Sequence, residues 1–433
     1  MKKYAYINGI LIDGTKEMEP VKGKVILVEG ETITDIVDKK NFKKKGYKVI
    51  DLKGKYILPG LINMHMHIAL PDYAPSRESN LDIEALGPLL QAVSKPRLMR
   101  YILKKYEEVL IRKDLYSGVT TVRAVGGVRD VDGKVRDDIN KGKAVGPRIL
   151  TSNSAISVPG GHMAGLIATK TKDPKMAEKD MKKLLKTKPD LVKLMITGGV
   201  MDATVVGEPG VLRMSPEIVK TCCDIAHENG LQVAAHVESA EGVRVALENG
   251  VDTIEHGFTL DDYMLDLFKK TGAAHTCTIS PAAPYAIMPR EVSYASEEGH
   301  INGKIVYDGI IECAKQCLAN DIPVSLGTDC GCAFVSHADM WRELRYFVKY
   351  VGASDREALY CATLGAAKIL KMDDCFGSLE AGKCADMIVC KKNPLEDVQA
   401  LRNVDMVVAR GKLYDKVKVR RGKRIANALD ELM

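Results

Sequence analysis

Two histidines stand one residue apart at the end of an apolar run, in the segment LPGLINMHMHI of residues 58–68. In an extended strand, residues i and i+2 point to the same face, roughly 6–7 Å apart. His65 and His67 are therefore able to reach one metal ion from the end of a strand. His-x-His alone is a weak signal, because two core histidines with ordinary hydrogen bonds give the same pattern.

Four further apolar runs each contain or end in an ionisable residue. Lys193 lies inside DLVKLMITGG, and the runs VAAHV, TIEHG and VSLGTD carry His236, His256 and Asp329. Burying such a group costs roughly 2–7 kcal/mol unless it is paired or coordinated. Taken singly, each histidine could have a purely structural role in the core, and Asp329 could be a helix N-cap. Taken together, these residues predict a shared metal site.

The central part of the chain alternates short apolar segments with amphipathic helical stretches such as SPEIVKTCCDIAHENG. This repeat predicts an α/β fold with parallel strands. With the strand that ends at His65 there are eight expected strands, the number that closes a (β/α)8 TIM-like barrel; the other seven are VTTVRAV, RILTSNS, DLVKLMITGG, LQVAAHVES, DTIEHG, AAHTCTIS and IPVSLGTD. A doubly wound open sheet is the alternative, but no Gly-x-Gly-x-x-Gly turn follows the first strand.

Both ends of the chain have a sequence pattern that differs from that of the central part. Residues 1–56 and 371–433 contain short alternating runs separated by glycine turns, such as KVILVEGETITDIV and VDMVVARGKLY. This pattern is typical of small antiparallel sheets. We therefore predict a barrel over residues 57–370 and a small β-sandwich domain built from both chain termini.

The composition is that of a globular protein, with 433 residues, 46% hydrophobic and 28% charged, and a net charge of +6. The basic residues form no stripe interleaved with aromatic residues, so we expect no nucleic-acid partner. No apolar stretch approaches the roughly 18 residues of a membrane span or the core of a signal peptide, so we expect no membrane association. The eleven cysteines, an odd number lying mostly in apolar segments, indicate a reducing compartment and a cytoplasmic location.

The motifs together resemble those of the metal-dependent amidohydrolase superfamily. The resemblance covers nearly the whole chain and rests on PGLINMHMH, GVTTVRAVGG, VKLMITGG, AAHV, IEHG, LGTD and GSLEAGKCADMIV. It is closest to the imidazolonepropionase-like and prolidase-like (Xaa-Pro dipeptidase-type) branch, which shares IEHG followed by GTD and a Gly-Gly-His loop, here PGGHMAG. Arg123-Ala124 departs from the Arg-Asp of many relatives, which leaves the substrate less defined than the metal site.

The resemblance implies two divalent metal ions, usually zinc. His65, His67 and Asp329 would bind one ion, His236 and His256 the second, and Lys193 would bridge them as a carbamate. The charges agree with this assignment, because a carbamate offsets part of the ions' positive charge, whereas a free ammonium would be repelled.

Catalytic and substrate-binding roles are also implied by the resemblance. Asp329 would move the proton from the attacking water to the leaving nitrogen, and His162 would donate a hydrogen bond to the substrate or the developing oxyanion. Glu238 faces the same side as His236 and would either meet a substrate amine or simply begin the next helix. In the loops that follow the strands we expect substrate binding by Arg77, Arg123, Arg213 and Tyr285.

The leading interpretation is a binuclear metal-dependent hydrolase of amide bonds, acting on Xaa-Pro dipeptides or N-acyl amino acids. The alternative is a mononuclear enzyme that opens a cyclic amide or deaminates a heterocycle; such enzymes generally lack the strand lysine, so Lys193 favours two metals. A phosphotriesterase or lactonase is a third reading, since the same ions activate water against those substrates. A non-catalytic scaffold is the fourth, although every candidate ligand is present. We expect a homo-oligomer with a small-molecule substrate.

Overall fold

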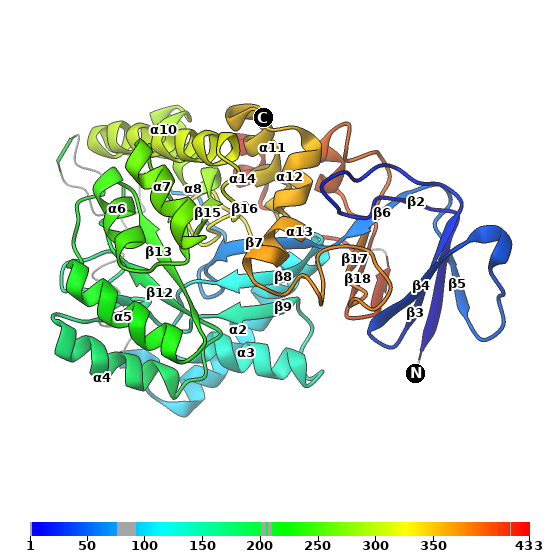
Figure 1. Cartoon of the computed structure of the whole chain (residues 1–433), viewed down its shortest axis with the longest axis horizontal. Helices are drawn as coiled ribbons and strands as arrows, with labels where there is room; N and C mark the ends of the chain where they lie inside the picture. The colour runs from blue at the N-terminus through cyan, green and yellow to red at the C-terminus, as the bar shows by residue number, and fades with distance from the viewer. Residues whose placement is uncertain (1, 76–91, 201–204, 207–209, 416) are drawn as a thin grey trace.

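Parallel strands form the centre of the molecule (Figure 1). The computed structural model describes residues 2–75, 92–200, 205–206, 210–415 and 417–433 and arranges these strands in two sheets. One sheet has the order β7-β8-β9, with bounds Leu61–Met66, Val119–Ala124 and Arg148–Thr151. The other has the order β11-β10-β12-β13-β14-β15-β16, with bounds Ala168–Lys170, Ala155–Ser157, Leu191–Met195, Gln232–Val237, Thr253–His256, Ala274–Cys277 and Val324–Leu326. The α/β class is therefore confirmed.

The two parallel sheets meet just beyond β7 and β16. The backbone N–H of Asp329 donates to the carbonyl of His65 at 2.8 Å, and that of His67 donates to the carbonyl of Cys330 at 3.1 Å. This arrangement is consistent with the expected (β/α)8 barrel, although the hydrogen-bonded ladder is divided between two sheets. Each of the eight segments expected to be strands contains one, and the short strands β10 and β11 are additional.

Helices cover the outside of the parallel strands (Figure 1). In α4, Asp173 accepts the N–H of Met176 as an N-cap, Pro174 occupies the first turn, and buried apolar residues recur at helical spacing. The helices are α2 (Arg97–Tyr116), α3 (Val131–Asn140), α4 (Pro174–Leu185), α5 (Pro216–Glu228), α6 (Ala240–Glu248), α7 (Asp262–Thr271), α8 (Ile279–Ala286), α9 (Arg290–Ser293), α10 (Glu297–Ala319), α11 (Met340–Tyr346), α12 (Asp355–Cys361), α13 (Leu364–Ile369) and α14 (Lys423–Asp430).

Two further sheets come from the ends of the chain. A four-stranded sheet has the order β4-β3-β1-β5, with bounds Thr32–Asp38, Lys24–Glu29, Lys3–Ile7 and Lys48–Asp51. A five-stranded sheet has the order β19-β18-β17-β6-β2, with bounds Lys412–Asp415, Met406–Ala409, Met387–Cys390, Tyr56–Pro59 and Ile10–Leu11. The second sheet pairs strands from opposite ends of the sequence, because β17 runs antiparallel to β6.

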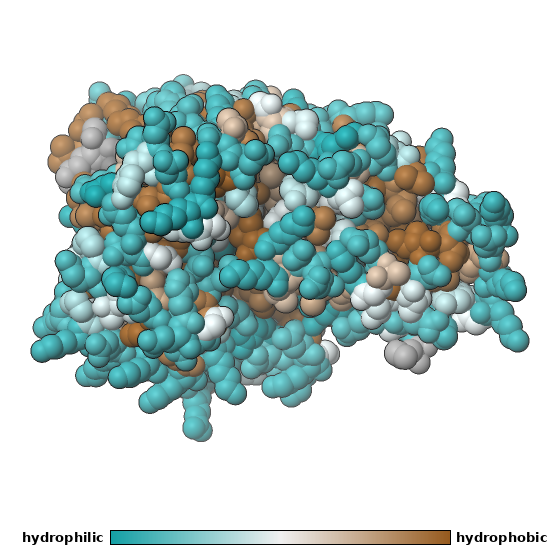
Figure 2. Space-filling model, in the orientation of Figure 1, coloured by the Kyte–Doolittle hydropathy of each residue, from teal (hydrophilic) through white to brown (hydrophobic). Residues whose placement is uncertain are grey.

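The two terminal sheets share one hydrophobic cluster, as expected of sheets that pack face to face. Tyr6 and Val28 of the first sheet and Ile57 and Met387 of the second belong to it. The domain boundaries at 56/57 and 370/371 stay a prediction. The face drawn in Figure 2 is mainly hydrophilic, with smaller apolar areas. Among the described residues, no helix combines the length and apolar character needed to cross a bilayer.

Candidate active site

The His-x-His pair lies at the carboxyl end of β7 and both rings are buried. His65 Nδ1 is 2.7 Å from Oε2 of Glu255, and His67 Nδ1 is 2.8 Å from the carbonyl oxygen of Gly126. The opposite nitrogens face a carboxylate: Nε2 of His65 and Nε2 of His67 lie 3.5 and 3.2 Å from Oδ1 of Asp329. Three residues from opposite ends of the parallel region thus converge on one point.

The hydrogen-bond partners decide where the imidazole protons sit. A carbonyl oxygen only accepts, so Nδ1 of His67 carries hydrogen; Nδ1 of His65 likewise donates to the Glu255 carboxylate. Burial lowers the pKa of His65 to about 4, so its Nε2 holds a lone pair at neutral pH. That lone pair faces a carboxylate oxygen, an arrangement that a bound cation between the two atoms stabilises.

Glu255 is held ionised to serve this role. Burial opposes its ionisation, but the Arg123 guanidinium and the hydrogen bond from His65 outweigh burial and keep the Glu255 pKa well below its ordinary value. The same carboxylate also accepts the hydroxyl of Thr253 at 2.6 Å.

His236 and His256 lie beside this pair at the ends of β13 and β14. The ring of His256 is 4.8 Å from that of His65 and 4.6 Å from that of His236, between centroids. Nδ1 of His256 is fixed at 2.7 Å from Oγ1 of Thr278. Both His256 and Asp329 have left-handed backbone conformations, with φ of 67° and 54°, which residues other than glycine uncommonly adopt.

Lys193 projects from the middle of β12 into the same region and is fully buried. Its Nζ has no hydrogen-bond acceptor in the described part of the chain. Burial lowers the pKa of Lys193 to about 8, although Glu255 and Asp329 act in the opposite direction. A buried ammonium group without an acceptor is costly, which suits a chemically modified or metal-bridging lysine better than a free one.

These side chains form two groups that share His256. Within each group, the ligand atoms lie within 4.8 Å of one another. The first group is His65, His256 and Asp329, and the second is His236, Glu238 and His256. Imidazole and carboxylate are the donors that zinc and related divalent ions prefer. The free Nε2 atoms facing Asp329 and the partnerless Nζ of Lys193 show that the donor set fits such an ion. Glu238 is an additional carboxylate at this point, and its Oε2 also accepts the N–H of Val200 at 3.0 Å.

Arg123, for which the position at a strand end predicted substrate binding, is directed into the interior of the strands, and the substrate-binding role stays a prediction. The guanidinium is buried and donates to the carbonyl of Met64 at 2.7 Å and to Glu255 at 2.6 Å. It also donates to the hydroxyls of Thr253 and Thr276, each at 3.0 Å. Because these protein acceptors occupy the guanidinium, Arg123 orders the interior of the strands and, through Glu255, the ring of His65.

A cavity of about 50 Å³ opens beside the histidines. His162, from the loop between β10 and β11, stacks on the ring of His236 with centroids 4.2 Å apart, and it lines the cavity. Tyr285, from α8, also lines the cavity, and burial raises its pKa to about 12, so its hydroxyl remains a donor at neutral pH. Much of the remaining wall is apolar, formed by Val200, Pro281, Ala282, Val306 and Ile310.

Of the other two predicted substrate-binding residues, only Arg213 is in the described part of the chain, and it does not line this cavity. Arg213 is exposed, and its backbone N–H donates to the carbonyl of Ile196, just beyond the end of β12. Arg77 lies outside the described residues. Their roles stay predictions.

Glu255 and Thr278 were not among the residues predicted to form the site. In β14, Glu255 directly precedes His256, and its carboxylate accepts the Nδ1 hydrogen of His65. A buried glutamate next to a candidate ligand is a signal for a carboxylate that orients another histidine.

Comparisons with known proteins agree with this geometry. The model of the Amidohydrolase family matches residues 56–414. A solved structure from Bifidobacterium longum, named a candidate prolidase, is 32% identical and covers 99% of this chain and 98% of its own, with a TM-score of 0.86. A Xaa-Pro dipeptidase with methionine bound in its active site is 29% identical, with coverages of 96% and 100% and a TM-score of 0.82. Ochratoxinase from Aspergillus niger is 24% identical over 437 residues, which cover 94% of this chain and 85% of the relative.

Proposed function

This chain belongs to the amidohydrolase family, and from that premise we propose that it is a binuclear metal-dependent hydrolase of carbon–nitrogen amide bonds. Its substrates in this proposal are Xaa-Pro dipeptides or N-acyl amino acids. The observation that carries the proposal is the convergence of the histidine, lysine and aspartate side chains of five strands or strand ends; these are His65, His67, Lys193, His236, His256 and Asp329. The similarity to a Xaa-Pro dipeptidase over nearly the full chain supports the substrate class.

We assign His65, His67 and Asp329 to one zinc ion and His236 and His256 to a second. When bound, the ions supply Lewis acidity toward water and toward the scissile carbonyl. Lys193 would help to hold both ions as a carbamate, which would form when its neutral amine adds carbon dioxide and releases a proton. The burial of Nζ without an acceptor supports this modification, because a carbamate replaces an unsatisfied ammonium with a ligand.

The chain's own residues handle protons and orient the substrate. Asp329 is a buried carboxylate whose Oδ1 lies 3.5 and 3.2 Å from the Nε2 atoms of His65 and His67. In this proposal it accepts a proton from the attacking water and delivers it to the leaving nitrogen. His162 and Tyr285, which both line the cavity, donate hydrogen bonds to the substrate carbonyl and its developing oxyanion.

The first test is elemental analysis of protein expressed with zinc, combined with a substrate panel of Xaa-Pro, Xaa-Arg and N-acyl amino acids. We expect about two metal ions per chain in the wild type and fewer in Lys193→Ala, with hydrolysis lost. The matched control is Lys182→Ala, which replaces an exposed lysine on α4 and should retain both the metal content and the hydrolytic activity of the wild type.

A metal content of about one ion per chain that does not change in Lys193→Ala would contradict the binuclear assignment. The mononuclear alternative, ring opening or deamination of a heterocycle, would then be tested with heterocyclic substrates. The cytoplasmic location and the homo-oligomer stay predictions.

A further inference from the structure

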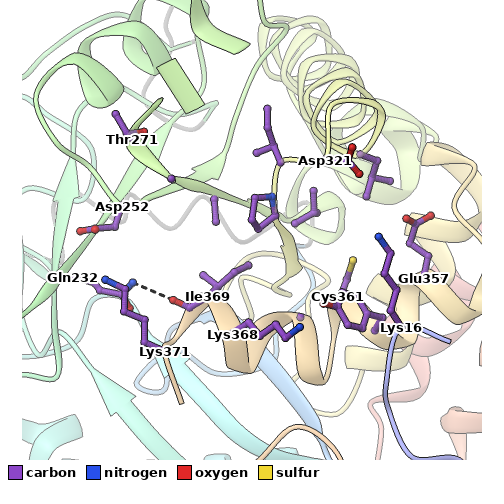
Figure 3. A pocket seen from close by; sticks show the side chains of 18 residues that line it. Lys16, Gln232, Asp252, Thr271, Asp321, Glu357, Cys361, Lys368, Ile369 and Lys371 are labelled. Atoms are coloured by element: carbon purple, nitrogen blue, oxygen red, sulfur yellow. Dashed lines mark hydrogen bonds between the residues drawn. The ribbon is translucent and has the colours of Figure 1, made fainter. Parts of the chain in front are cut away.

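A second cavity lies at the amino ends of the parallel strands, opposite the histidine cluster (Figure 3). Its volume is about 390 Å³, within the range of small-molecule sites. Gln232, Ala274 and Val324, the first residues of β13, β15 and β16, form part of its wall. Helices α12 and α13 and Lys16, from the amino-terminal part of the chain, complete it. The cavity thus lies where the terminal segment meets the parallel strands, and pockets at such junctions commonly bind ligands.

Two polar side chains in this wall are held in place by the protein. Nε2 of Gln232 donates to the carbonyl of Ile369 at 3.0 Å. Oδ2 of Asp252 accepts the N–H of Val233 at 2.7 Å and lies 2.8 Å from Nε2 of His227. These groups are already engaged. The other charged side chains that line the cavity are Lys371, drawn beside Gln232 in Figure 3, and four on the other side of the cavity.

That side carries charges of both signs. Figure 3 shows Lys16 and Lys368 on it together with the carboxylates of Asp321 and Glu357. In the part of the chain that the structure describes, none of these four side chains forms an ion pair. This side of the cavity therefore holds two ammonium groups and two carboxylates that do not neutralise one another.

We infer that this cavity binds a zwitterionic α-amino acid or short peptide. The ligand carboxylate is placed to pair with Lys16 and Lys368, and its ammonium group with Asp321 and Glu357. A purely anionic ligand would be repelled by the two carboxylates, and a purely cationic one by the two lysines. The apolar residues between them, including Pro323 and Ile322, accommodate an aliphatic side chain.

This site goes beyond the proposed function and does not depend on it. An amidohydrolase that releases amino acids would supply a ligand of this chemistry, but binding here requires neither metal nor turnover. The two proposals therefore fail separately.

The test is calorimetric titration of L-leucine into the full-length protein, with L-leucinamide and N-acetyl-L-leucine as probes that each lack one charge. We expect L-leucine to bind at least about five-fold more tightly than either analogue, a difference of ~1 kcal/mol. The double variant Lys16→Gln/Lys368→Gln and the single variant Glu357→Gln should weaken L-leucine binding by a similar factor. Lys182→Gln, an exposed lysine away from the cavity, should leave it unchanged.

The titrations are repeated after the metal is removed with a chelator. Binding that persists, and that remains sensitive to the cavity variants, supports the site. Binding that disappears with the metal would place L-leucine at the histidine cluster and overturn the inference. So would unchanged binding in both cavity variants, an absence of binding to the wild type, or binding of inorganic phosphate in preference to L-leucine.

Discussion

Replacement of Glu255 by glutamine removes the carboxylate that orients His65. In the native structure one oxygen accepts Nδ1–H of His65 at 2.7 Å, and the other accepts Arg123 and Thr253, each at 2.6 Å. Every group around Glu255 is therefore a donor. A glutamine amide has one accepting oxygen and one donating NH₂, so it satisfies only one side.

Each orientation of the amide has a calculable consequence. With its NH₂ toward Arg123, the guanidinium becomes a buried cation without a carboxylate, which destabilises the fold by ~3–5 kcal/mol. With its NH₂ toward His65, Nδ1 must accept, and the ring hydrogen moves to the Nε2 that faces Asp329. The metal then loses a ligand lone pair, and its affinity falls by about 10–100-fold, as for other groups that orient metal-binding histidines.

The assay measures both quantities separately. Competition with a chromophoric chelator gives the metal affinity of Glu255→Gln, and urea unfolding of the metal-free protein gives its stability. The matched control is Glu107→Gln, which alters another buried carboxylate, on α2, that touches none of the proposed ligands. We expect the control to bind metal as tightly as the wild type.

Unchanged metal affinity together with unchanged stability in Glu255→Gln would refute this reasoning. It would mean that His65 holds its orientation and its tautomer without the carboxylate.

Three further substitutions have expected outcomes. Tyr285→Phe removes a hydroxyl donor from the cavity, so we expect kcat/KM to fall by about 10–100-fold at unchanged metal content, measured on the best substrate of the panel. Arg123→Lys replaces a guanidinium that spans several acceptors, so we expect a loss of ~2–4 kcal/mol in urea unfolding; a raised KM without destabilisation would instead support the substrate-binding role first predicted for Arg123. Burial and the neighbouring Asp132 raise the pKa of Glu107 well above its ordinary value. Between the unfolded and folded pKa values, the unfolded state releases a proton that the folded state keeps, so stability falls as pH rises. Glu107→Gln removes this titrating group, so the free energy of unfolding of the variant, relative to that of the wild type, should increase from about pH 5 to about pH 8 in urea unfolding. A difference in free energy that does not change with pH would contradict the raised pKa of Glu107.

The amino-acid sequence by itself determined the order of elements and the residues that could do chemistry. Period-two and helical patterns are local, so the alternation of strands and helices was readable from it. The ligand candidates were also readable, because an ionisable side chain inside an apolar strand is costly and therefore conspicuous, as with Lys193. A small β domain built from both chain ends was predicted from their short strands and glycine turns, whereas the pairing of β17 with β6 in one sheet came from the structure.

The tertiary structure decided which partners these residues meet. Arg123 looks the same in sequence whether it faces a substrate or the strand interior, and only the positions of Met64, Thr253 and Glu255 show that it faces inward. The tautomer of His65 depends on Glu255, which lies 190 residues away in the chain. Such contacts join strands that are distant in sequence, and neither local periodicity nor residue type encodes the side-chain distances on which the chemistry depends.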